Sequence, residues 1–167
     1  MTTGGFSSAE LALQESALTL RHLDTAAALA IGEIALQIAH ERDLAAAIEV
    51  RIGDWIVFHA ALPGTDSGND SWIARKARVV ALTGHATMYE RVKAEEEGIN
   101  WYEANNAPEA TYAIHGGGIP LIVESAGQQG TLIISGLPQV EDHLLGVEIL
   151  TQYLAVQGTK KPEGEGK

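Results

Sequence analysis

Residues 115–143 gather, within a short stretch, residue types that suit a ligand site. His115 precedes three consecutive glycines, which allow a ligand to approach the main chain closely. Asp142 and His143 then fall at an expected helix start, where free backbone N–H groups favour anions. The stretch predicts a site in which His115 is a ligand or an acid–base group. The glycines could equally form only a bend that leads into a strand.

Two residues earlier in the chain extend this candidate site. His59 ends an expected strand before a loop, a junction that often carries functional groups. Lys76 falls in the apolar stripe of an expected helix, where its ammonium could meet a buried carboxylate such as Asp142. His59 could instead be satisfied by a backbone carbonyl, and Lys76 could extend to solvent. The candidate ligand-binding residues are His59, Lys76, His115, Gly116, Gly117, Gly118, Asp142 and His143.

Three kinds of function stay open on these residues. The first is a ligand-binding protein. The second is an enzyme on a small metabolite, with a histidine as acid or base and Lys76 holding a carboxylate. The third is an assembly or adaptor protein without chemistry. The histidines and Asp142 could also form a mononuclear metal site by composition, but no metal-binding, nucleophile or dinucleotide signature is present.

Composition narrows these classes. The 167 residues suit one domain, and a hydrophobic content of 46% predicts a folded core. The net charge of −11 argues against binding to nucleic acid or anionic membranes, although a locally basic pocket could still hold a small anion. Without cysteine, disulfides, thiolate metal sites and iron–sulfur clusters are excluded. No secretory signal or membrane-length apolar run is visible, so we expect a soluble cytoplasmic protein.

Periodicity then predicts the elements that position the candidate residues. Residues 1–16 form an N-terminal extension in which Ser7 and Glu10 have capping-box spacing, and Leu18 and Leu20 suggest a short strand. Asp24 is an expected N-cap. The further expected elements are a helix to about 42, strands 48–52 and 55–60, helices 71–82 and 87–97, strands 119–124 and 131–135, and a helix from 138 to about 156.

The expected last helix is apolar on two sides, so either another layer or a neighbouring subunit should cover the second side. We expect one domain over residues 17–156, followed by a disordered polar tail over 157–167.

Three segments together resemble a known family: FHAALPGTDSGNDSWIARKARVV, YAIHGGGIPLIV and GTLIISGLPQVEDHLLGVEIL. They are similar to small uncharacterised members of the haem-degrading-domain superfamily, which includes GlcG-like and HbpS-like proteins. The resemblance implies an α/β (α+β), profilin-like fold, with a mainly antiparallel sheet of about five strands and helices on its faces. It also implies a homo-oligomer that binds a small-molecule ligand, either haem or a small anionic molecule.

The resemblance also covers individual positions. Lys76 matches the lysine of a Lys-Ala element in the helix after the first hairpin, and Asp142 matches an acidic residue of the last helix. Residues 116–120 match a Gly-Gly-x-Pro strand start. His59, His115 and His143 match the histidine-rich branch of the superfamily.

Overall fold

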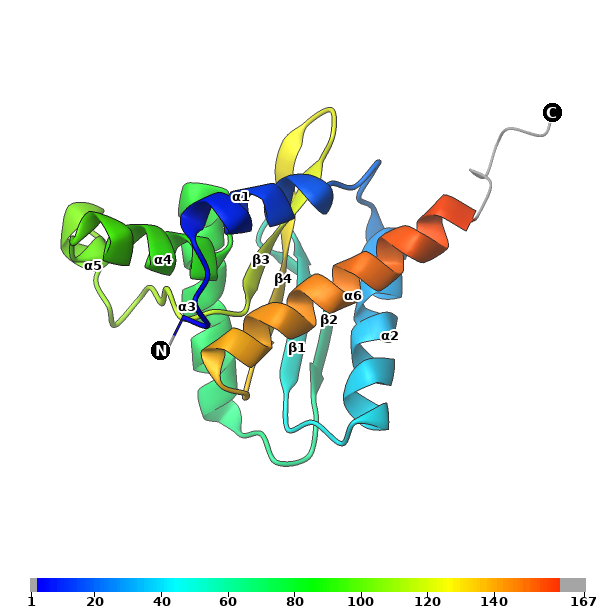
Figure 1. Cartoon of the computed structure of the whole chain (residues 1–167). Helices are drawn as coiled ribbons and strands as arrows, with labels where there is room; N and C mark the ends of the chain where they lie inside the picture. The colour runs from blue at the N-terminus through cyan, green and yellow to red at the C-terminus, as the bar shows by residue number, and fades with distance from the viewer. Residues whose placement is uncertain (1–2, 160–167) are drawn as a thin grey trace.

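A computed structural model describes residues 3–159 and shows an antiparallel sheet flanked by helices (Figure 1). Within these residues the sheet has four strands in the order β2-β1-β4-β3. Every neighbouring pair is antiparallel. The strands are β1 (Ala47–Ile52), β2 (Trp55–Ala61), β3 (Gly118–Val123) and β4 (Gly127–Ser135).

Helices cover both faces of the sheet. The helices are α1 (Ser8–Ala17), α2 (Thr25–Glu41), α3 (Ser67–Thr83), α4 (Thr87–Glu97), α5 (Trp101–Ala104) and α6 (Gln139–Thr159). Helices α2 and α6 pack on one face, and α3 packs on the other (Figure 1). None of the helices in residues 3–159 is long and apolar enough to span a membrane.

Strand alternation builds one core on each face of the sheet. Ile48, Val50 and Ile134 point into the main core beneath α2 and α6. Ala47 and Ile133, which alternate with them, form a smaller core with α3. The antiparallel α+β architecture expected from the sequence is therefore confirmed, and α3 and α6 lie on opposite sides of the sheet.

The expected number of strands was wrong by one, because the segment around Leu18 and Leu20 is not a strand. Leu20 makes only an isolated parallel bridge to Val123. Residues 18–24, between α1 and α2, are long enough for a strand, but they form no continuous ladder with the sheet. The bridge still ties this linker to the sheet, because the Leu20 N–H donates to the Ile122 carbonyl at 2.7 Å.

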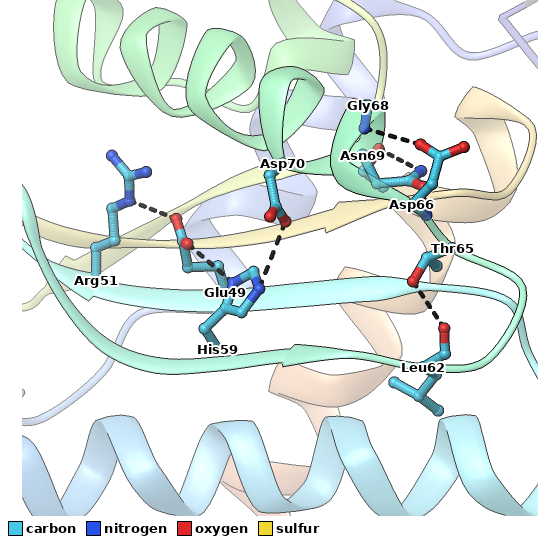
Figure 2. Close-up of polar contacts among 10 residues, drawn as sticks. Glu49, Arg51, His59, Leu62, Thr65, Asp66, Gly68, Asn69 and Asp70 are labelled. Atoms are coloured by element: carbon cyan, nitrogen blue, oxygen red, sulfur yellow. Dashed lines mark hydrogen bonds and ion pairs between the residues drawn. The ribbon is translucent and has the colours of Figure 1, made fainter.

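Several boundaries differ from the expected ones by a few residues. Helix α3 begins at Ser67 rather than 71, because Asp66 is its N-cap and forms a capping box with Asn69 (Figure 2). Strand β4 begins at Gly127 and so includes residues expected in a turn. Helix α6 continues to Thr159, so the expectation of a tail from 157 was wrong for residues 157–159, and the rest of the expected tail, 160–167, lies outside the described residues.

A further layer covers the second apolar side of α6. Ile149 belongs to the main core between α6 and the sheet. Val140 instead packs against the cluster of Leu11, Met88 and Val92, which comes from α1 and α4. Contacts within one chain therefore account for part of the apolar residues on the two sides of α6.

Gly32 offers a test of how closely α2 packs on the sheet. A Cβ at this position would lie 2.3 Å from the Phe58 ring. For Gly32→Ala, overpacking of about 1–3 kcal/mol should exceed the roughly 1 kcal/mol gained in helix propensity. We expect the free energy of unfolding, measured with urea, to fall. In the Gly32→Ala background, the further substitution Phe58→Leu should lower the free energy of unfolding by less than it does in the wild type. A more stable Gly32→Ala variant would contradict this packing.

Candidate functional site

The candidate site is a pocket of about 260 Å³ where α3, the end of β4 and the start of α6 meet. It brings together three of the residues expected from the sequence: Lys76, His115 and Asp142. The full lining is Asn69, Trp72, Lys76, His115, Ser135, Gly136, Leu137, Gln139 and Asp142.

Lys76 and Asp142 form a buried ion pair across the two helical layers. Each residue is 2% exposed. Lys76 Nζ donates to Asp142 Oδ2 at 3.1 Å and to the Ile134 carbonyl at 2.8 Å. Asp142 Oδ1 accepts the Leu137 N–H at 3.0 Å, which fixes the chain just before α6. The expectation that Lys76 meets a buried carboxylate matches this geometry.

Gly117 leaves the space through which Lys76 reaches Asp142. A Cβ on Gly117 would lie 2.8 Å from Lys76 Nζ and 3.1 Å from Asp142 Cβ. The φ of Gly117 is +126°, which side-chain-bearing residues rarely adopt. Its neighbours are equally confined, since a Cβ on Gly116 would meet the Gln139 carbonyl at 2.3 Å. The glycine run therefore makes a close approach between chain segments, beside the pocket rather than in its lining.

Burial favours the neutral forms of both partners in this pair. It raises the pKa of Asp142 to about 6, although the Lys76 charge and the Leu137 N–H act in the opposite direction. Burial likewise lowers the pKa of Lys76, with the Asp142 carboxylate acting against this effect. Burial thus brings the pKa values of the two groups closer together.

His115 lies against Trp72 at the pocket. The two rings are 4.7 Å apart in an edge-to-face arrangement, and among residues 3–159 no hydrogen-bond partner contacts the buried His115 Nδ1. Burial lowers the pKa of His115, and the charges of Arg91, Lys76 and Arg75 lower it further. The neutral imidazole therefore sits in a locally positive environment.

His59 lies apart from this pocket, on the sheet face beneath α3. Figure 2 shows its ring between Glu49 and Asp70. His59 Nδ1 is 3.1 Å from Glu49 Oε1, and Nε2 is 3.4 Å from Asp70 Oδ1. Glu49, which is buried, also accepts from Arg51 Nε at 2.6 Å. Both nitrogens of His59 thus face carboxylates of the protein itself.

His143 faces a different part of the molecule from its neighbour Asp142. It is 2% exposed, and its Nε2 is 2.7 Å from Gln14 Oε1 of α1. Phe6 packs edge-on against its ring. Burial lowers the pKa of His143 to about 4. It lines a separate cavity of about 10 Å³ with Gln14, so the structure does not bring His143 to the pocket.

Six of the nine lining residues were not among those expected from the sequence, and two of these six, Asn69 and Trp72, lie on the same helix as Lys76. Asn69 and Trp72 precede Lys76 on α3 at spacings of seven and four residues, which place all three on neighbouring parts of one helix face. The helical spacing around Lys76 was the signal that could have identified both residues.

The sequence is similar to a family of known proteins. The sequence model described as "Haem degrading protein HbpS-like" matches residues 23–151. A UPF0303 protein of Streptomyces avermitilis is 42% identical over 145 residues, covering 87% of this chain and 89% of the relative. The chain belongs to the HbpS-like family, and the resemblance noted in the sequence is confirmed.

Solved structures are similar to the whole fold. The crystal structure of the Ybr137w protein has a TM-score of 0.82 and 25% identity, covering 89% of this chain and 88% of that one. The crystal structure of a PduOC:Heme complex has a TM-score of 0.61 and 14% identity, covering 76% of this chain and 94% of that one. This likeness concerns the fold alone.

The residues of this pocket do not fit an enclosed haem. A volume of about 260 Å³ lies below the roughly 300–1,000 Å³ typical of sites for drug-sized ligands, and haem is a large rigid macrocycle. Of the pocket lining, His115 alone could be an axial histidine. Among residues 3–159, no group of three or more acidic, histidine or cysteine side chains is arranged to hold a metal ion. The pocket suits a smaller molecule.

The ion pair predicts how stability depends on pH. Because the pKa of Asp142 is higher in the folded protein than its ordinary value, this group stabilises the fold at low pH, and the contribution is lost as pH rises through about 6. Lys76→Met removes the neighbouring cation and should raise this pKa further. We expect a loss of about 3–5 kcal/mol in the free energy of unfolding near pH 8, and a smaller loss near pH 5.

Urea unfolding across this pH range measures the effect. The double variant Lys76→Met/Asp142→Leu removes both charges and should recover much of the stability, with a weaker dependence on pH. A Lys76→Met loss of equal size at both pH values would mean that Asp142 does not titrate as described.

Proposed function

We propose that this protein binds a small carboxylate-bearing molecule in the pocket between α3 and α6. The observation that carries the proposal is the positive environment of His115. Lys76 lines the pocket, and Arg75 lies 4.4 Å from the centre of the Trp72 ring, which lines it too. The charges of both, together with that of Arg91, lower the pKa of His115, and Glu109 acts in the opposite direction. In a chain of net charge −11, such a locally cationic site favours an anion over its surroundings.

Lys76 supports the proposal through its hydrogen bonds. A lysine ammonium has three N–H donors. Asp142 and the Ile134 carbonyl accept two of them, and Lys76 lines the pocket. A third N–H of the ammonium would donate to an anionic oxygen of a ligand, in a charge-assisted hydrogen bond.

Trp72 and His115 line the pocket and offer an aromatic surface to the apolar part of such a ligand. Their edge-to-face packing makes one aromatic wall, and Arg75 lies 4.4 Å above the Trp72 ring. This wall suits the short carbon skeleton of a metabolite beside its charged end. Haem is the other ligand that the family description suggests, and the size of the pocket favours the smaller anion.

Binding of malonate, pyruvate and acetate tests the proposal directly. We expect saturable heat in calorimetry and a change in tryptophan fluorescence that disappears in Trp72→Phe. Lys76→Met/Asp142→Leu, which lacks the amine without leaving a buried charge unpaired, should weaken binding about 10–100-fold. Arg78→Met changes an exposed cation on the same helix and should leave affinity unchanged.

Two results would overturn this function. One is the absence of binding by all three carboxylates. The other is equal weakening by the Lys76 and Arg78 variants, which would show a general charge effect. Haemin is titrated in parallel, and a shift of its Soret band with no carboxylate binding would favour haem.

We also propose that the chain forms a homo-oligomer. Leu144 and Val156 of α6 are 45% and 46% exposed, and Trp55 and Ile56 of the edge strand β2 are exposed as well. Exposed apolar side chains mark a protein interface where they gather into one patch. Light scattering should give a mass that is a multiple of 17.7 kDa, whereas a monomer at micromolar concentration would contradict an oligomer.

A further inference from the structure

We propose that the Lys76 amine condenses with the carbonyl carbon of a small 2-oxo acid in this pocket and forms an imine. The inference rests on the proposed function, because it needs the same pocket and an anionic ligand. It adds a covalent step at one nitrogen atom.

The position of Lys76 Nζ is fixed at the wall of the pocket. The contacts to the Ile134 carbonyl and to Asp142 Oδ2 come from two different elements, β4 and α6. Gly117 borders the nitrogen on another side, where a Cβ would come within 2.8 Å. A nucleophile held in this way loses little freedom when it reacts, which lowers the barrier to attack.

The surroundings of Lys76 also favour the form of lysine that reacts. Only the neutral amine attacks a carbonyl, and desolvation is a known way of producing it. Burial lowers the pKa of Lys76 and raises that of Asp142, so a neutral amine beside a carboxylic acid is accessible here. The acid is 3.1 Å from the nitrogen, within reach for proton transfer.

The step balances with these two side chains and the ligand. The Lys76 nitrogen forms a bond to the carbonyl carbon, and the carbonyl oxygen becomes a hydroxyl group by taking a proton from nitrogen. Asp142 then protonates this hydroxyl group, which leaves as water as the carbon–nitrogen double bond forms. The products are a protonated imine on Lys76, one water molecule and the Asp142 carboxylate, which pairs with the new cation.

The distribution of charge identifies the substrate class. A 2-oxo acid carries its carboxylate one bond from the reacting carbonyl. The charges of Arg91 and Arg75 act at His115, Lys76 supplies the amine, and His115 and Lys76 line the same space. A carboxylate near His115 would therefore direct the adjacent carbonyl toward Lys76.

Reductive trapping tests the inference in the intact protein. The full chain is incubated with pyruvate and sodium cyanoborohydride, which reduces the imine to a stable amine, and modified peptides are identified by mass spectrometry. We expect an adduct on Lys76 that has the mass of pyruvic acid less one oxygen atom. Lys93, exposed on α4, is the internal control and should react several-fold less. In urea, both lysines should react alike.

The possible results separate the two proposals. Selective modification of Lys76 supports the imine. Pyruvate binding without an adduct on Lys76, or with equal modification of Lys93, overturns the imine and leaves the binding function in place. Neither binding nor an adduct overturns both.

Discussion

The Lys76–Asp142 ion pair is the interaction on which the candidate site depends. It joins α3 to α6, which lie on opposite faces of the sheet, by passing the end of β4 beside Gly117. The same carboxylate holds the Leu137 N–H and so fixes the chain that leads into α6. The walls of the pocket are set by these contacts, because Lys76, Leu137 and Asp142 all belong to its lining.

Stability alone is a weak explanation for such a pair. Removing two charges from water is expensive, and apolar residues of similar volume often serve a core equally well. Here the burial is nearly complete on both sides, yet the pair stands at the wall of a pocket and not in the centre of a core. Ionisable groups whose pKa values are strongly shifted in a cleft are candidates for function. These properties of the pair support its proposed role in binding a ligand, beside its role in joining α3 to α6.

The sequence allowed the fold and part of the site to be predicted, for different physical reasons. Alternation and capping signals identified the hairpin β1–β2 and the start of α2, since both are local. A charged residue in an apolar stripe and a carboxylate at a helix start pointed to Lys76 and Asp142. Their meeting depends on packing across the sheet, which no local pattern encodes. His59 could not be placed, because its partner Glu49 looked like an ordinary solvent-facing residue of a strand.

The contrast between Asp142 and His143 shows why proximity in sequence is a poor guide to a shared site. Consecutive residues on a helix point about 100° apart. Asp142 turns toward α3 and the pocket, and His143 turns toward α1, where Gln14 and Phe6 enclose it. His115 is far from both in sequence, but the bend at the glycine run returns it to the pocket beside Trp72. The pocket is thus built from one face of α3, the end of β4, the start of α6 and the loop that carries His115, and only the folded chain brings these four segments together.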